Sequence, residues 1–298
     1  MGRIEPLELA LERAFGRIVG SETPPRLAAA MRHAVFPGGA RFRPALVLAV
    51  ADACGARGSH AAQHAAVAVE LVHCASLVHD DLPCFDNAPI RRGLVSVHAK
   101  YGEALAVLVG DGLIVGAFDE VAVALTKHPS LAPMVAVLAR AVGANGGLVG
   151  GQAWEGEPSA CVNRYHRAKT AALFEAATCM GAIAAGAAPS RWRELGTVLG
   201  EAYQIADDLA DLVATPTALG KPVGQDLVHS RPSAAIELGV ERAFERLEVV
   251  VAHMAEVVPT CAGADALQQW MVSACERLFP RRAVPHHSPA IGDASLSA

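Results

Sequence analysis

The chain has 298 residues, of which 52% are hydrophobic and only 5% aromatic, and its formal net charge at pH 7 is −5. Abundant Ala and Leu with few aromatic residues favour helices over strands, and the negative charge without a long basic run argues against a nucleic-acid partner. The seven cysteines are scattered with no C-x-x-C pair, which is typical of reduced core thiols and argues against zinc.

Apolar residues recur at helical spacing along most of the chain. The spacing predicts helices over residues 4–18, 26–35, 44–56, 61–82, 103–126, 131–146, 163–187, 190–214, 233–257 and 263–279. Gly and Pro separate these segments, no strand alternation is visible, and no interdomain linker interrupts them. We therefore expect an all-α, single-domain bundle of about ten helices over residues 1–280. The Ser-, Pro- and His-rich residues 281–298 are expected to form a frayed tail.

The hydrophobic content raises the question of a membrane span. The longest uncharged run, Ala176–Ser190, is shorter than the ~18–20 apolar residues that a spanning helix needs. The first residues carry Glu5, Glu8 and Glu12, unlike a signal or transit peptide. We expect a cytoplasmic protein without stable membrane insertion.

The first chemically informative segment joins an apolar helix to a turn rich in acids. Asp80 and Asp81 end the apolar stretch, Pro83 stops the helix, and Asp86 follows in the turn. Adjacent acids near a core are costly unless they are solvated or bind a cation. Taken alone, this segment fits a surface charge cluster at a helix end as well as it fits a cation site.

A second segment favours the cation site. Gln204, Asp207 and Asp211 are spaced three and four residues apart in an apolar helical pattern, so they share one helix face. Two helices that present carboxylates to each other suit Mg²⁺, which binds oxygen ligands and is often shared with substrate phosphates. The alternative, a di-iron bundle, needs E-x-x-H pairs, and neither segment contains one.

Several cations accompany the two acidic segments. Arg91 and Arg92 follow the first one, Lys169 interrupts an apolar helical stretch, and Lys221 follows the second one. Any one of them alone is best explained as a solvated surface charge. As a set, placed around two acidic clusters, they indicate a diphosphate substrate, because arginine grips phosphate oxygens in a forked geometry.

These motifs stand in the order found in one known family. DDLPCFD (Asp80–Asp86), RRG (Arg91–Gly93), GGQ (Gly150–Gln152), KT (Lys169–Thr170), DDLAD (Asp207–Asp211) and GKPVGQD (Gly220–Asp226) all occur. Between about residues 37 and 232 the chain resembles the trans-isoprenyl diphosphate synthases. It is most similar to the bacterial members that make geranylgeranyl diphosphate for carotenoid biosynthesis.

The resemblance implies the isoprenoid synthase fold, a central catalytic cavity, a homodimer and about three Mg²⁺ ions. It implies a transferase that condenses isopentenyl diphosphate with allylic diphosphates (dimethylallyl, geranyl, farnesyl) by Mg-assisted ionisation. By this resemblance the metal ligands are Asp80, Asp86 and Asp207, and Asp81, Arg91 and Lys169 are also catalytic. The allylic diphosphate would be bound by Arg91, Lys169, Thr170, Gln204 and Lys221. Isopentenyl diphosphate would be bound by Arg43, His73 and Arg92.

Two departures from the family pattern concern the isopentenyl diphosphate pocket. Ala40 stands where a lysine is usual, and Arg41 is a candidate to supply the missing charge. Arg231 and Pro232 stand where a lysine–threonine pair is more usual. Product length is expected to depend on Ala75, because family members that stop at fifteen carbons carry an aromatic residue there.

Two other functions remain open from the sequence. A terpene cyclase of the same helical class also ionises a diphosphate on magnesium, but it would not need Arg43, His73 and Arg92. A non-catalytic partner subunit would have no need of two intact acidic motifs. We expect Trp154 and Glu155 to be structural, and the glycines before Gln152 to allow close helix packing.

Overall fold

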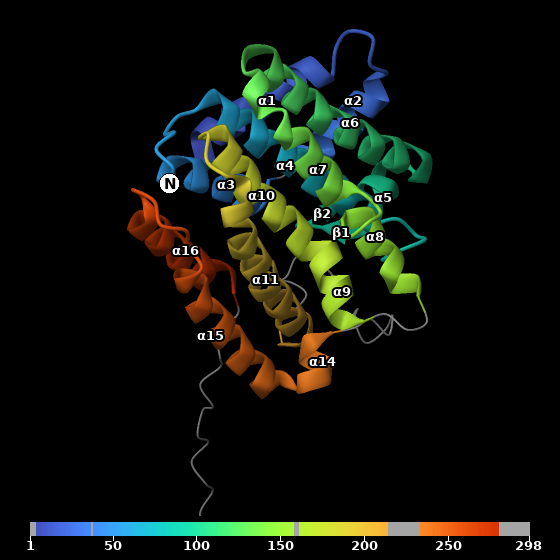
Figure 1. The fold of residues 1–298 in the computed structure, drawn as a ribbon. Helices are drawn as coiled ribbons and strands as arrows, with labels where there is room; N and C mark the ends of the chain where they lie inside the picture. Colours follow the sequence, from blue (N-terminus) through green and yellow to red (C-terminus); the bar gives the residue numbers. More distant parts are fainter. Residues whose placement is uncertain (1–3, 37, 158–160, 214–232, 280–298) are drawn as a thin grey trace, which may run out of the picture.

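The computed structural model describes residues 4–36, 38–157, 161–213 and 233–279, and within them the protein is a helical bundle (Figure 1). The predicted all-α architecture is confirmed. The helices of the first half are α1 (Ile4–Ile18), α2 (Pro25–Val35), α3 (Phe42–Ala53), α4 (His60–Asp80), α5 (Val97–Tyr101), α6 (Glu103–Lys127) and α7 (Pro133–Val142).

The second half continues the bundle. Its helices are α8 (Leu148–Ala153), α9 (Val162–His166), α10 (Ala172–Ala184), α11 (Arg193–Val213), α14 (Ala234–Leu238), α15 (Val240–Glu256) and α16 (Ala264–Leu278). The short helices α5 and α8 are additional to the ten predicted ones. The helix predicted over residues 233–257 is divided at Gly239, whose φ of +81° lies in the left-handed region.

Helix α4 forms the centre of the bundle, where it packs against α3, α6 and α10. The hydroxyl of Ser59 caps its N-terminus by accepting from the amide of Ala62. Its side chains are buried on most sides, as expected of a helix that is apolar all round. By length and composition α4 resembles a membrane span, but 72% of its apolar window is buried inside the molecule, as in a core helix.

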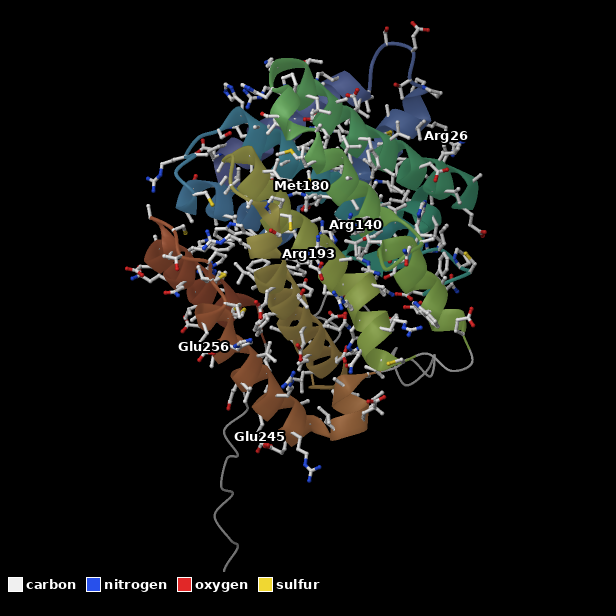
Figure 2. All side chains as sticks on the ribbon, in the orientation of Figure 1. Arg26, Arg140, Met180, Arg193, Glu245 and Glu256 are labelled. Carbon is white, nitrogen blue, oxygen red and sulfur yellow. The ribbon has the colours of Figure 1, made fainter. Side chains whose placement is uncertain are left out.

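The outer helix α15 shows the opposite pattern. Phe244, Leu247 and Val250 lie on its buried face, and α15 packs through that face against α11. Glu245 and Glu256 project into solvent (Figure 2). This apolar stripe at helical spacing is what positions α15 beside α11, because only one face gains from burial.

A small β-hairpin follows the first acidic turn, where the sequence predicted no strand. Strands β1 (Ile90–Arg91) and β2 (Leu94–Val95) pair antiparallel, with Ile90 opposite Val95. The two connecting residues, Arg92 and Gly93, have φ of +54° and +76°, which corresponds to a type I′ turn. Strands of two residues are too short for an alternation to be recognised in the sequence, and the turn residues are the only local signal.

The helix predicted over residues 163–187 is interrupted by a π-helical turn, Arg167–Ala171. Such turns are common at functional sites, because the extra residue redirects side chains. Glycines on two neighbouring helices contact this turn closely. A Cβ at Gly151 would lie 2.4 Å from the amide nitrogen of Lys169, and a Cβ at Gly200 would lie 2.4 Å from the Cα of Ala171. Close packing is therefore confirmed as the role of Gly151.

Candidate active site

A cavity of about 710 Å³ lies within the bundle, lined by residues from α3, α4, the hairpin, α6 to α8, the π-helical turn, α10 and α11. The predicted site residues that line it are Arg43, His73, Asp80, Asp86, Arg91, Arg92, Lys169, Thr170, Gln204 and Asp207. Asp81 and Ala75 are not among the lining residues. Lys221, Arg231 and Pro232 lie outside the described residues, as does the predicted tail.

The first acidic segment brings carboxylates together at the end of α4. The chain turns back after the helix, and the amide of Asp86 donates to the carbonyl of Asp80 at 2.9 Å. Carboxylate oxygens of Asp80, Asp86 and Glu155 lie within 4.8 Å of one another. This all-oxygen donor set fits Mg²⁺, which prefers carboxylates and water. Asp207 lines the same cavity from α11 but is not part of this cluster.

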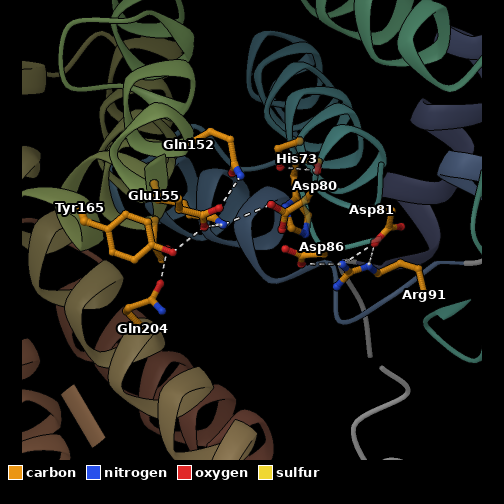
Figure 3. A network of polar contacts seen from close by, with 12 residues as sticks. His73, Asp80, Asp81, Asp86, Arg91, Gln152, Glu155, Tyr165 and Gln204 are labelled. Atoms are coloured by element: carbon orange, nitrogen blue, oxygen red, sulfur yellow. Dashed lines mark hydrogen bonds and ion pairs between the residues drawn. The ribbon is translucent and has the colours of Figure 1, made fainter. Parts of the chain in front are cut away.

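Lys169 forms ion pairs with two of these acids, Asp80 and Glu155, which are labelled in Figure 3. Its amine is 3.2 Å from Oδ1 of Asp80, and it also donates to Oε1 of Glu155. Tyr165 donates its hydroxyl to the same Glu155 oxygen at 2.7 Å, and the amide of Gln152 donates to Oε2 at 2.7 Å. The nearby acids raise the pKa of Lys169 although burial opposes this, so the amine is a cation at neutral pH.

Glu155 is the site residue that the sequence analysis missed. We expected it to be structural, but it contacts the predicted catalytic lysine and lies beside two predicted metal ligands. Gln152 lies three residues earlier, so both side chains can reach the same side of this short helical segment. That spacing after the GGQ motif was the available signal. Trp154 does have a packing role, since the guanidinium of Arg164 lies 5.2 Å from its ring centroid.

Asp81 is a buried partner of Arg91. Oδ1 of Asp81 accepts from both Nε and Nη2 of Arg91, at 2.8 and 2.5 Å. Burial raises the pKa of Asp81 to about 6, although Arg91 acts in the opposite direction. Arg91 in turn lies 3.9 Å from Oδ2 of Asp86. Asp81 therefore orients Arg91 at the edge of the acidic cluster, and it differs from Asp80 in facing away from the cavity lining.

Arg43, His73 and Arg92 meet in one cationic corner of the cavity. Nη2 of Arg92 donates a hydrogen bond to Nε2 of His73 at 3.2 Å. Because Nε2 accepts, the imidazole ring is neutral and carries its proton on Nδ1. Burial and the surrounding arginines lower the pKa of His73 well below its usual range. Gly39 lets the arginine approach, since a Cβ there would lie 2.6 Å from Cζ of Arg92.

Arg43 has no carboxylate partner among the described residues. Its guanidinium lies 4.4 Å from the ring centroid of Phe174 and 4.8 Å from that of Tyr203. Its buried Nε has no hydrogen-bond acceptor in the described part of the chain. An unsatisfied buried donor is costly, so this arrangement suits a ligand that brings oxygen atoms to Arg43.

The proposed replacement of the missing lysine by Arg41 is wrong. Arg41 is 3% exposed and does not line the cavity. Its guanidinium donates to Glu70 at 2.5 Å and to Glu8 at 2.8 Å, and also to the carbonyl of Val35. Glu8 lies on α1 and Glu70 on α4, and the backbone of Arg41 is left-handed, with a φ of +47°. Its charge is therefore paired with Glu70 inside the protein and is not available to a ligand in the cavity.

The second acidic helix presents Gln204, Asp207 and Asp211 to the cavity, as the spacing predicted. Thr170 of the π-helical turn donates its hydroxyl to Oε1 of Gln204. The amide of Gln204 donates to Oδ1 of Asp208 at 2.7 Å, and Oδ2 of Asp208 accepts from the backbone of Ala234 at 2.7 Å. Asp208 thus joins α11 to the start of α14 and fixes the orientation of Gln204.

The residues of α4 that precede Asp80 bear on product length. Ser76 lines the cavity, whereas Ala75 is 1% exposed and is not a lining residue. His79 does line the cavity and lies one turn after Ala75 on the same face of α4. A side chain longer than that of alanine at position 75 could therefore reach the cavity along this face.

The sequence matches the model of the polyprenyl synthetase family over residues 24–263. It is 49% identical to a geranylgeranyl diphosphate synthase of Cereibacter sphaeroides over 92% of this chain and 96% of that protein. It is 48% identical to a geranylgeranyl diphosphate synthase of Rhodobacter capsulatus over 88% of this chain and 91% of that protein.

Solved structures agree with these sequence matches. A geranyltransferase of Helicobacter pylori, complexed with magnesium and isoprenyl diphosphate, aligns with a TM-score of 0.76 at 28% identity and covers 92% of this chain and 97% of that chain. A geranyltransferase of Legionella pneumophila aligns with a TM-score of 0.77 at 27% identity, covering 92% and 93%.

Proposed function

The chain belongs to the polyprenyl synthetase family, and we propose that it condenses isopentenyl diphosphate with allylic diphosphates to give mainly geranylgeranyl diphosphate. One observation carries the proposal: a single cavity holds acids from α4 and α11, the cations Arg91 and Lys169, and the separate cationic corner around Arg92. A condensation of two diphosphates needs two such anion sites. A terpene cyclase needs one.

The allylic diphosphate binds between the two acidic helices. Asp80, Asp86 and Asp207 hold about three Mg²⁺ ions, while Lys169 and Gln204 contact the diphosphate, assisted by Arg91, Thr170 and Lys221. The carboxylate cluster supports the metal assignment, as does the magnesium complex of the related geranyltransferase. Mg²⁺ held by these acids would supply positive charge to the leaving diphosphate, which would lower the barrier to breaking its bond to C1.

Isopentenyl diphosphate binds at Arg43, His73 and Arg92. The unpaired Nε of Arg43 and the neutral His73 support this assignment, because both leave hydrogen-bonding capacity for an incoming diphosphate. The double bond of isopentenyl diphosphate then attacks C1 of the allylic cation, and the released diphosphate takes the proton. The apolar residues of the cavity, among them Val72, Ile114 and Leu173, exclude water from the cation.

Product length follows from how far the cavity extends beyond the acids. Alanine at position 75 and serine at position 76 leave room at the level of the fifth and fourth residues before Asp80. This level lies ~7.5 Å from Asp80 along the helix, and without a bulky side chain there the chain grows past fifteen carbons, to about twenty. A product of this length supplies carotenoid biosynthesis.

A homodimer completes the proposal. Val107, Leu108 and Val115 are 42%, 52% and 69% exposed on one face of α6, and Val135 is 38% exposed on the adjacent α7. These exposed apolar side chains, with the exposed Asp111 between Leu108 and Val115, form a patch that suits an interface with a second copy. We place the protein in the cytoplasm, because α4, which by length and composition could span a membrane, is mostly buried in the core.

The test is a product assay combined with substrate kinetics. Purified protein is incubated with Mg²⁺, labelled isopentenyl diphosphate and each allylic primer in turn, and the product lengths are measured. We expect geranylgeranyl diphosphate as the main product. Each lost charge-assisted contact should cost ~1.5–3 kcal/mol, so Arg92→Ala should raise mainly the KM for isopentenyl diphosphate, and Lys169→Ala that for the allylic substrate. Cyclised products, or no incorporation of label, would rule the proposal out.

A further inference from the structure

Glu155 is placed and constrained in a way that the proposed reaction does not by itself explain. It is not a residue of the cavity lining, and its side chain is only 11% exposed. Tyr165 and Gln152 donate to its two carboxylate oxygens, one to each (Figure 3). These two bonds orient the carboxylate, and Lys169, which lines the cavity as Tyr165 and Gln152 do, donates to it as well. Glu155 is thus an oriented anion paired with a lysine of the cavity lining.

Lys169 forms ion pairs with both Glu155 and Asp80. Asp80 is also a proposed ligand of the divalent cation. Asp80 and Asp86 are the ligands proposed for a divalent cation, and Lys169 lies 3.2 Å from Oδ1 of Asp80. A lysine ammonium and a divalent cation repel each other, so they compete for the same carboxylate oxygen. A cation bound at that oxygen would displace the amine from it. Glu155 remains available to it, held in place by Tyr165 and Gln152.

We propose that Glu155 is a positioning residue that retains Lys169 at the diphosphate site when a divalent cation displaces the lysine from Asp80. Metal binding then directs Lys169 towards the allylic diphosphate, so metal and substrate bind cooperatively. Without Glu155 the lysine would stay on Asp80 and oppose metal binding. The inference rests on the proposed function through the role of Lys169 as a ligand of the allylic diphosphate.

The proposal makes opposite predictions for two substitutions. Glu155→Gln keeps the shape of the side chain but loses its charge, so Lys169 is left on Asp80 and metal affinity falls. Lys169→Met removes the competing cation, so metal affinity rises. In the double variant there is no lysine to retain, and the Glu155→Gln change should then have no further effect. This non-additivity separates positioning from a direct electrostatic effect of Glu155 on the metal.

The experiment measures Mn²⁺ binding to the full chain without substrate, by electron paramagnetic resonance, together with KM for both substrates. For Glu155→Gln we expect about ten-fold weaker Mn²⁺ binding and about ten-fold higher allylic KM, with the KM for isopentenyl diphosphate within about two-fold. Glu155→Asp, which keeps the charge, should recover part of both losses. The control is Glu157→Gln, an exposed glutamate two residues later, which should behave as the unmodified protein.

Results of three kinds would overturn the inference. One is an unchanged Mn²⁺ affinity and allylic KM in Glu155→Gln. Another is loss of one bound Mn²⁺ ion in Glu155→Gln, or a Glu155→Gln change that weakens Mn²⁺ binding as much in the Lys169→Met background as in the unmodified protein. In either case Glu155 would act on the metal itself. The third is an equal rise in both KM values with a lower Tm, which indicates a structural role. The role of Lys169 as an allylic ligand fails separately if Lys169→Met leaves the allylic KM unchanged, and the proposed function fails if the unmodified protein makes cyclised products or incorporates no label.

Discussion

Arg92 donates a hydrogen bond from Nη2 to Nε2 of His73 at 3.2 Å. Arginine can only donate, so the histidine nitrogen has to accept, and the ring has to be neutral. The contact therefore ties the cationic corner of the cavity to one protonation state. It holds only while the pKa of His73 stays below the working pH, as burial and the neighbouring arginines ensure.

This pKa shift predicts acid destabilisation of the fold. Because the folded state lowers the pKa of His73 below its unfolded value of about 6.5, the stability that the neutral ring contributes is complete above pH ~6.5 and decreases below it, by up to ~1.4 kcal/mol per pH unit. His73→Gln retains an acceptor near Nε2 but cannot titrate. Urea unfolding between pH 5.5 and 7.5 should therefore show that the free energy of unfolding falls less at acidic pH in this variant than in the unmodified protein. Parallel pH profiles for the two proteins would contradict the prediction.

The metal assignment predicts that catalysis depends on a divalent cation. Excess EDTA should abolish activity, and Asp80→Asn or Asp86→Asn should lower kcat by about 10²-fold or more, since charge neutralisation in the transition state is lost. The control is Asp265→Asn, an exposed acid on α16, which should retain full kcat. Undiminished turnover by Asp80→Asn at saturating Mg²⁺ would exclude Asp80 as a required ligand.

The Arg41–Glu70 pair predicts a large loss of stability when only one partner is removed. Both side chains are 1% exposed, so Arg41→Ala leaves a buried unpaired carboxylate and should lower the free energy of unfolding by roughly 3–5 kcal/mol. Replacing both residues, as in Arg41→Met with Glu70→Leu, should cost less. Urea titrations of the three proteins measure this. If Arg41→Ala instead raised only the KM for isopentenyl diphosphate, the arginine would be a substrate ligand after all.

Product length should respond to position 75. Ala75→Tyr should shift the main product from geranylgeranyl towards farnesyl diphosphate, because a longer side chain on the face of His79 would occupy the cavity. Overpacking costs ~1–3 kcal/mol, so the Tm has to be measured alongside the products. Ala75→Ser is the control of nearly unchanged volume and should keep the C20 product. A folded Ala75→Tyr protein that still makes the C20 product would leave Ala75 without a role in chain length.

The α6 surface predicts dimerisation. Val115→Glu places a charge on the exposed apolar patch and should convert dimer to monomer at micromolar concentration, because a buried unpaired charge opposes association. Light scattering coupled to gel filtration measures this directly. Val249→Glu on α15 is the matched control, since Val249 is 60% exposed outside the patch. Equal masses for both variants and the unmodified protein would argue against an interface at α6.

The sequence by itself predicted most of the fold and much of the candidate site. The long helices follow from apolar spacing, which depends only on the geometry of one helix. The common face of Gln204, Asp207 and Asp211 follows from the same rule, and the structure places all three at the cavity. Pro83 and the adjacent acids likewise marked the end of α4, because proline cannot continue a helix. These predictions concern residues within one element.

Only the tertiary structure decided which charges meet across elements. Arg41 and Arg43 are two residues apart, yet one contacts Glu70 in a buried ion pair and the other faces the cavity. Glu155 contacts Lys169 because Gly151 lets the two segments approach closely. A charged side chain takes its partner from its surroundings in space, and helix packing sets those surroundings. The spacing of residues along one helix contains no record of that packing, so the chemistry could be predicted from the motifs while the partners of Arg41 and Lys169 could not.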